Sequence, residues 1–272
     1  MNRISVFYEH ILEAAAGTGA SAKECLRAAR SFGIEGLECD LWRLNAEAKQ
    51  LFERCGMSVV SVYNMFDFPH APRSESLRRI QESLETAAAF GAGNFLAIPG
   101  FAAEGEDMDE VRESICGLLE VMCGRAAEYG ISVTLEDFDD RAAPYSTISG
   151  LEFFMKNVRG LGLTFDTGNF AYSEESAEEA YSALHTFIRH VHLKDRSLDA
   201  SRKNSENTNA KQTLSGRVMY PCEVGGGFIG IGELLGLLRA DGYGGWLSIE
   251  HFGAASQLGY MKKSAEFIRS NM

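Results

Sequence analysis

The 272-residue sequence lacks a long hydrophobic run, and its first stretch, MNRISVFYEH, has no apolar core. A membrane-spanning helix needs about 18 or more apolar residues, so we expect neither a signal peptide nor a membrane anchor. Cysteine is also scarce: the six residues form no C-x-x-C pair and have no zinc-ligand spacing. We therefore expect reduced, mostly buried thiols in a cytoplasmic protein.

Basic residues are outnumbered by acidic ones, with 26 Lys and Arg against 38 Asp and Glu and a formal net charge of −12. Binding to a phosphate backbone depends on concentrated Lys and Arg, so we expect no nucleic-acid partner. The acidic balance does not oppose a metal ion or a small polar substrate. Linkers and low-complexity segments are absent as well, and we expect a single domain over residues 1–272.

What is present is a regular alternation of short apolar runs and longer amphipathic stretches. Most of the runs are continuous, which is typical of parallel strands that are covered on both faces. Eight strands are predicted, at residues 4–8, 36–39, 58–63, 94–98, 132–136, 162–166, 190–194 and 246–250.

Glycine residues lie at the boundaries between these stretches and the apolar runs. Several amphipathic stretches end on Gly just before the next apolar run, as in SFGIEG and RCGMSVV, which is typical of a helix-to-strand turn. Eight strand–helix units in a chain of this length predict a (β/α)₈ TIM barrel. An open doubly wound sheet is the alternative, but YEHILEAAAGTGAS is a poor phosphate loop, and GTGAS fits a loop and helix cap better.

Only one long polar segment interrupts the pattern, and it follows the seventh predicted strand. We expect a loop at about residues 196–223, on the active-site face of the barrel. It has no clear Arg-rich phosphate clamp, although its basic residues include Arg196, Arg202, Lys203 and Lys211. The sequence VGGGF that follows it could bind an anion at a helix N-terminus or could form a tight turn.

Four successive predicted strands end at or near an ionisable residue. The motifs VTLEDF, LTFDTGN, HVHLKDR and LSIEHF supply Glu136, Asp166, His192 and Glu250. Consecutive strands of a parallel barrel are neighbours, so these side chains should converge on one side of its mouth. Three carboxylates and one imidazole suit Mn²⁺, Mg²⁺, Co²⁺ or Zn²⁺ rather than a thiolate-bound metal.

Each of these residues also has an ordinary explanation. A single Glu at a strand end is commonly a solvated residue or a helix cap, Asp166 could cap the turn after it, and His192 could be a core histidine. Together, however, three carboxylates at one level would repel one another without a cation between them. We therefore predict a shared divalent metal ion.

These motifs, in this order, resemble the xylose isomerase-like TIM-barrel family of sugar and sugar-phosphate isomerases and epimerases. The resemblance covers nearly the whole chain and rests on GIEGLE, AIPG, TLED, FDTGN, HVHLKD and YGGWLSIEH. It implies that Glu136, Asp166, His192 and Glu250 bind the metal, with Mn²⁺ as the favoured ion and Zn²⁺, Co²⁺ or Mg²⁺ as alternatives. It also implies that Glu136 and Glu250 act as the acid/base pair.

The activity that this resemblance implies is isomerisation or epimerisation of a ketose or ketose phosphate. A divalent ion bound to the carbonyl and hydroxyl oxygens stabilises a cis-enediolate, while one Glu on each face takes a proton and returns one. Return to the same carbon from the opposite face gives an epimer, and return to the neighbouring carbon gives an isomer. The expected partner is thus a small sugar or sugar phosphate, and a homo-oligomer is left open.

Four outer residues are candidates for substrate binding. The family precedent places a histidine at His190, although we expect this side chain to face away from His192, and it suggests that Lys194 reaches a substrate oxygen. The alternative for Lys194 is a strand-end ion pair. Glu38 ends the second predicted strand as a candidate polar contact, and Asn169 could donate to substrate or cap a helix.

Two departures from the family pattern leave the substrate open. Asn169 stands where several epimerases have a substrate-contacting His, and Ile98 precedes Pro-Gly where a His is common. Inosose dehydratase, which acts on a cyclitol ketone, is the main alternative, and a non-catalytic sugar-binding barrel is another. A related apurinic endonuclease would need extra histidines and a basic DNA face, which the sequence lacks.

Overall fold

The computed structural model describes residues 3–203 and 210–272. Its barrel strands are β1 (Arg3–Phe7), β2 (Ile34–Asp40), β3 (Ser58–Met65), β4 (Asn94–Ile98), β5 (Ser132–Leu135), β6 (Gly162–Asp166), β7 (Ile188–Ser197) and β10 (Trp246–Glu250). Neighbouring strands pair in parallel, and β10 pairs with both β1 and β7, which closes the barrel. The predicted TIM barrel and its eight strands are confirmed.

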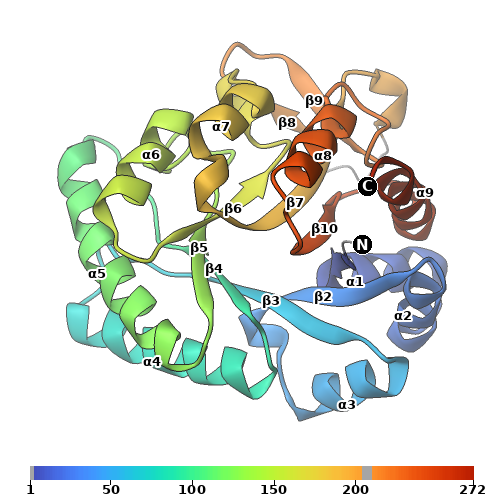
Figure 1. The fold of residues 1–272 in the computed structure, drawn as a ribbon, viewed down its shortest axis with the longest axis horizontal. Coiled ribbons are helices and arrows are strands. Elements are labelled where there is room, and N and C mark those ends of the chain that lie inside the picture. The colour runs from blue at the N-terminus through green and yellow to red at the C-terminus, as the bar shows by residue number, and fades with distance from the viewer. Residues whose placement is uncertain (1–2, 204–209) are drawn as a thin grey trace.

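Helices surround the strands, as Figure 1 shows. In the described residues they are α1 (Tyr8–Thr18), α2 (Ala22–Ser31), α3 (Ala46–Cys55), α4 (Arg73–Ala89), α5 (Met108–Glu128), α6 (Ile148–Asn157), α7 (Ala177–Leu184), α8 (Ile231–Ala240) and α9 (Gln257–Asn271). Local sequence determines where they begin and end. Ser21 and Glu24 form a capping box at the start of α2, as the GTGAS loop predicts, and Gly56 adopts a left-handed conformation after α3.

The interior of the barrel is partly polar. Asn94 Nδ2 donates to Ser61 Oγ at 3.0 Å and to Thr134 Oγ1 at 3.2 Å, and Thr134 Oγ1 lies 2.7 Å from Thr164 Oγ1. All four side chains are buried, and they come from four successive strands. These four buried side chains therefore hydrogen-bond to one another. Ser61 Oγ also donates to Glu38 Oε1 at 3.0 Å, which connects them to the functional site.

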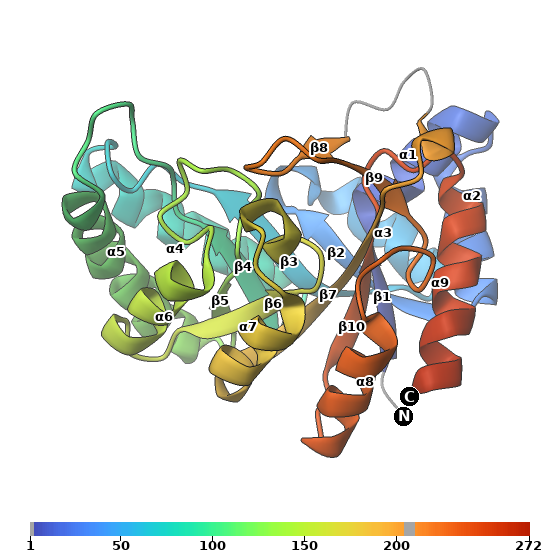
Figure 2. The ribbon, with the colours of Figure 1, turned by 90° about the horizontal axis from the view of Figure 1, so that it is seen from above.

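The segment after β7 is more ordered than the predicted loop. β7 continues to Ser197 and pairs antiparallel with β9 (Val218–Cys222), which in turn pairs with β8 (Lys211–Gln212). Figure 2 shows β8 and β9 over one end of the barrel. The part of the predicted loop at residues 204–209 lies outside the described residues.

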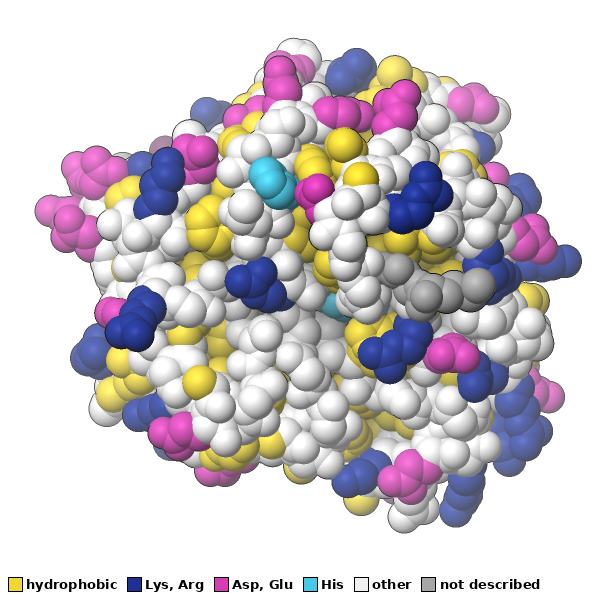
Figure 3. Space-filling view, in the orientation of Figure 1, with side chains coloured by type: hydrophobic (Ala, Val, Ile, Leu, Met, Phe, Trp, Pro, Cys, Tyr) yellow, Lys and Arg dark blue, Asp and Glu magenta, His cyan; other side chains and the backbone are white. Residues whose placement is uncertain are grey.

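None of the described helices combines the length and apolar character needed to cross a membrane. All six cysteines lie in the described part of the chain as free thiols, and all but Cys116 are buried, as expected. On the face of the molecule in Figure 3, acidic and basic side chains are both distributed around the surface.

Candidate metal and active site

The four predicted ligands meet at one end of the barrel. Glu136, Asp166, His192 and Glu250 are all buried, and each offers a ligand atom within 4.8 Å of the others. Strand register explains this convergence, because Asp166 on β6 pairs directly with His192 on β7. Glu250 ends β10, which is the other neighbour of β7.

His192 lies at the centre of this group, and its Nδ1 atom is the common point. Nδ1 is 2.5 Å from Glu136 Oε1, 3.2 Å from Glu250 Oε2 and 3.9 Å from Asp166 Oδ2. The imidazole nitrogen and three carboxylate oxygens therefore surround one small volume. This is the donor set that hard or borderline divalent ions prefer, so the residues fit a metal of the predicted kind.

The two carboxylate oxygens of Asp166 have different contacts. Oδ1 accepts hydrogen bonds from the backbone N–H groups of Gly168 at 2.7 Å and Asn169 at 2.8 Å. Oδ2 accepts no hydrogen bond of good geometry among the described residues and lies 3.0 Å from the Lys194 Nζ atom. The residue thus stabilises its own turn and still presents one oxygen to the site.

Lys194 supplies positive charge beside the carboxylates. Its Nζ atom lies 2.5 Å from Glu250 Oε1 and donates to Asn169 Oδ1 at 2.8 Å, in addition to its contact with Asp166. Burial alone would lower the pKa of Lys194, but Asp166 and Glu250 outweigh burial and hold this pKa above its ordinary value. The ammonium group is therefore charged, and it balances part of the negative charge.

Burial and neighbours shift the pKa values of the two glutamates in opposite directions. Burial raises the pKa of Glu136 to about 8, although nearby His192 acts against this shift. Burial would also raise the pKa of Glu250, but Lys194 and His192 outweigh it and hold this pKa below its ordinary value. Two carboxyl groups whose proton affinities differ in this way can act as acid and base in one reaction.

Glu38 and His190 lie deeper in the barrel, and their placement corrects one prediction. His190 was expected to face away from His192, which is wrong, because side chains two residues apart on a strand share a face. His190 Nε2 lies 2.8 Å from Glu38 Oε2, and His192 Nε2 lies 2.9 Å from the same oxygen. Glu38 is thus in contact with both histidines.

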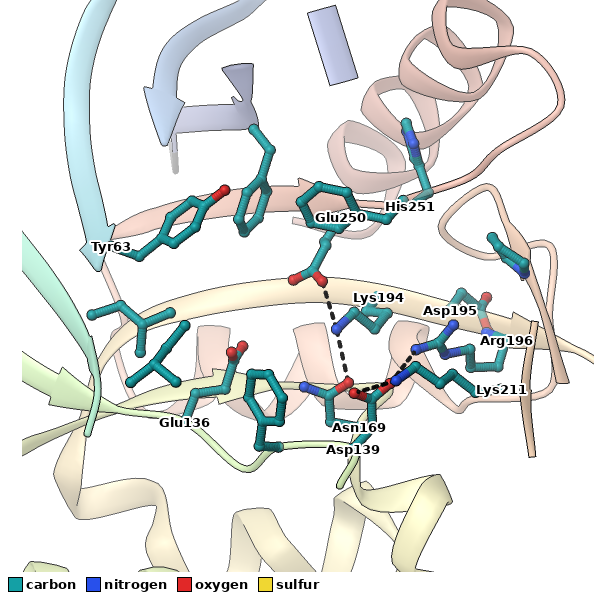
Figure 4. A pocket seen from close by; sticks show the side chains of 16 residues that line it. Tyr63, Glu136, Asp139, Asn169, Lys194, Asp195, Arg196, Lys211, Glu250 and His251 are labelled. Atoms are coloured by element: carbon teal, nitrogen blue, oxygen red, sulfur yellow. Dashed lines mark hydrogen bonds and ion pairs between the residues drawn. The ribbon is translucent and has the colours of Figure 1, made fainter. Parts of the chain in front are cut away.

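A cavity of about 290 Å³ opens above the four ligands. Figure 4 shows Glu136 and Glu250 approaching it from opposite sides, with Lys194 and Asn169 to one side of both carboxylates. Aromatic and aliphatic side chains complete much of its wall: Phe7, Tyr63, Leu96, Ile98, Phe138 and Phe252. The cavity can therefore hold a small polar molecule against the two glutamates.

Several residues of the cavity were not singled out from the sequence. Asp139 lies on the wall together with Arg196 and Lys211, which the sequence showed only as basic residues of the long segment. Asp137 is fully buried beside Glu136, and its carboxylate has no hydrogen-bond partner among the described residues. The TLED motif contains Asp137, but no local signal separates it from a solvated acidic residue.

The glycine-rich sequence VGGGF forms an internal anion site. The Asp195 carboxylate accepts hydrogen bonds from the backbone N–H groups of Gly225 at 3.0 Å, Gly227 at 2.9 Å and Ile229 at 3.3 Å. The anion at this turn is thus a side chain of the protein itself.

Comparison with known proteins gives a partial match in sequence and nearly full-length matches in fold. A 112-residue segment, 39% of this chain and 37% of the relative, is 32% identical to an inosose dehydratase of Clostridium botulinum. This chain therefore aligns with well under half of that protein's length.

Two solved structures share the fold over nearly the whole chain. A D-allulose 3-epimerase from Methylomonas sp. has a TM-score of 0.75 at 15% identity and is matched over 100% of this chain and 98% of that chain. A xylose isomerase-like TIM barrel protein from Mycobacterium smegmatis, in complex with magnesium, has a TM-score of 0.72 at 17% identity, with 100% and 96% covered. At these identities the likeness shows the fold alone.

A family model described as the xylose isomerase-like TIM barrel matches residues 12–271 of the chain. The match covers the strands that carry all four predicted ligands. This protein belongs to the xylose isomerase-like TIM barrel family.

Proposed function

We propose that this protein is a metal-dependent isomerase or epimerase of a ketose or ketose phosphate. The observation that carries the proposal is the convergence of Glu136, Asp166, His192 and Glu250 beneath a small cavity. Glu136, Asp166 and Glu250 would hold a divalent ion through carboxylate oxygens, and His192 would do so through Nδ1. The ion would act as a Lewis acid towards the carbonyl and hydroxyl oxygens of the substrate.

Glu136 and Glu250 perform the proton transfers in this proposal. They reach the cavity from opposite sides, so one carboxylate can remove the proton beside the substrate carbonyl while the other returns a proton. Return from the opposite face to the same carbon inverts that carbon, whereas return to the neighbouring carbon moves the carbonyl. The position of the second glutamate relative to these two carbons thus determines which product forms.

Lys194 and Asn169 orient the substrate. The Lys194 ammonium group lines the cavity and already donates to Asn169 Oδ1. Its other two protons face Glu250 Oε1 and Asp166 Oδ2, and one of them would become available to a substrate oxygen when these carboxylates hold the metal instead. The aromatic wall lowers the polarity beside these groups, which strengthens their charged interactions.

Deuterium exchange from solvent tests the proposal. The protein is incubated in D₂O with a panel of ketoses and ketose phosphates, with Mn²⁺ or with EDTA. We expect Mn²⁺-dependent incorporation of deuterium beside the carbonyl together with an epimer or isomer. Binding of a sugar without any exchange would instead indicate a non-catalytic sugar-binding barrel.

Dehydration of a cyclitol ketone is the second candidate, favoured by the partial match to an inosose dehydratase. Dehydration also begins with proton removal beside a carbonyl, and it then needs a proton for the departing hydroxyl. Glu136, whose pKa is raised to about 8, is a suitable donor for that proton. Formation of an unsaturated ketone from an inosose, detected by its ultraviolet absorbance, would support this alternative over the first.

A further inference from the structure

A pair of basic side chains lies at the end of the cavity away from Glu136. Arg196 belongs to the extension of β7 beyond the barrel, and Lys211 belongs to β8. Both contact Asp139: Arg196 Nη2 donates to Oδ2 at 3.3 Å, and Lys211 Nζ lies 3.0 Å from Oδ1. Figure 4 shows this group beside Lys194 and Asn169.

Arg196 and Lys211 share one ion-pair partner. Within the described residues, Asp139 is the carboxylate that forms an ion pair with each of them. Asp195 lies nearby, but its carboxylate accepts hydrogen bonds from the backbone N–H groups of the glycine-rich turn instead. Two cations thus share one directly paired carboxylate.

Arg196 is also short of hydrogen-bond acceptors. Its side chain is 7% exposed, yet in the part of the chain that the structure describes its only side-chain hydrogen bond is the one to Asp139. Its Nε atom is buried and has no acceptor there. Leaving donors of a buried charged group unsatisfied is costly, so a further acceptor on this guanidinium group would be stabilising.

We propose that the substrate carries an anionic group, a carboxylate or a phosphate, which binds Arg196 and Lys211 while its ketone lies against Glu136 and Glu250. Both ends line one cavity of about 290 Å³, and apolar residues such as Phe138 and Pro221 lie on the same wall. The planar guanidinium group suits two oxygens of such an anion, and the lysine adds a point charge. This inference rests on the proposed function and specifies its substrate class.

Three small α-hydroxy ketones of different charge test the inference. Dihydroxyacetone is neutral, dihydroxyacetone phosphate carries a phosphate, and hydroxypyruvate carries a carboxylate. Their dissociation constants are measured by isothermal titration with metal-free protein. We expect at least one anionic probe to bind about 10-fold to 100-fold more tightly than dihydroxyacetone, since a hydrogen bond to a charged group contributes about 1.5–3 kcal/mol. The probe that gains affinity distinguishes phosphate from carboxylate.

Two variants test whether Arg196 and Lys211 cause the preference for an anionic probe. Arg196→Met and Lys211→Met should each reduce the affinity for the preferred anionic probe by about tenfold, the loss of one charge-assisted hydrogen bond, and leave dihydroxyacetone within about twofold. Arg78→Met, at an exposed Arg that pairs with Glu82 on α4, is the charge-matched control. Lys211 is 39% exposed, so its variant carries the test if Arg196→Met fails to fold.

Equal affinity of the wild-type protein for all three probes would overturn the inference, as would an equal loss for all three in both variants. Failure of the proposed function would appear separately, as the absence of Mn²⁺-dependent deuterium exchange into dihydroxyacetone and the panel of sugars. Binding and exchange are independent measurements, so the two failures are distinguishable.

Discussion

His192 Nε2 lies 2.9 Å from Glu38 Oε2, across the interior of the barrel and 154 residues away in the chain. A carboxylate at this position accepts the Nε2 proton and leaves Nδ1 of His192 free to bind a cation. Metal-binding histidines are commonly oriented by a partner of this kind. The same Glu38 oxygen also contacts His190, so one buried carboxylate fixes both rings.

Glu38→Gln should weaken Mn²⁺ binding by about 10-fold to 100-fold, the usual effect of removing such a partner. The amide retains the shape of the side chain but loses the charge that holds the Nε2 proton. The free Mn²⁺ concentration, measured by electron paramagnetic resonance, gives the affinity. Glu35→Gln is the matched control, because Glu35 lies on the same strand but pairs with Arg30 at the surface. Equal Mn²⁺ affinity in the two variants would show that Glu38 does not support metal binding.

Glu136→Gln and Glu250→Gln should each reduce deuterium exchange by about 100-fold to 10,000-fold, the range for loss of a general acid or base. Mn²⁺ is added at concentrations that saturate each variant, so that weaker metal binding does not account for the loss. Glu82→Gln, at an exposed position on α4, is the control. Exchange at the wild-type rate in Glu136→Gln would contradict its role as acid or base.

Asp166 offers a test that separates turn stability from metal binding. In Asp166→Asn the side-chain oxygen can still accept the N–H groups of Gly168 and Asn169, whereas Asp166→Ala loses these bonds. We expect Ala to lower the free energy of unfolding by about 0.5–2 kcal/mol relative to Asn, as for other caps. Both variants should lose Mn²⁺ affinity. Urea unfolding of metal-free protein measures the first effect, and equal stability of the two variants would contradict it.

Mn²⁺ affinity should rise with pH through the neutral range. The raised pKa of Glu136 means that metal-free protein holds a proton on this carboxyl group at neutral pH. Against the effect of burial, Glu38 and Glu136 raise the pKa of His192 and hold a proton on its ring. Mn²⁺ must displace these protons, so its apparent affinity increases as the pH rises. Calorimetry in buffers of different ionisation enthalpy counts the released protons. An affinity independent of pH between 6 and about 8 would contradict the proton held by Glu136.

Saturation with Mn²⁺ should also stabilise the fold. A ligand at about 100 times its dissociation constant adds about 2.7 kcal/mol to the free energy of unfolding if it binds only the folded state. The midpoint of thermal unfolding should therefore rise with Mn²⁺ and return after EDTA. Because Asp166→Asn loses a ligand, its midpoint should not change with Mn²⁺.

Local sequence determined the architecture and most of the ligand group. Apolar runs and helix-ending glycines recur at short range, so eight strand–helix units could be predicted, and several strand boundaries agree within a residue or two. The convergence of Glu136, Asp166 and His192 follows from one rule, that consecutive parallel strands are neighbours. For the same reason the resemblance to the family could be based on short motifs.

Closure of the barrel decided the remaining contacts. Glu38 on β2 meets His192 on β7, although these strands are not neighbours, because their side chains cross the interior. Asp195 enters the glycine-rich turn, and β8 brings Lys211 to Arg196, only after the segment that follows β7 has folded back. Such contacts depend on strand stagger and side-chain direction between distant segments, which periodicity and spacing do not encode.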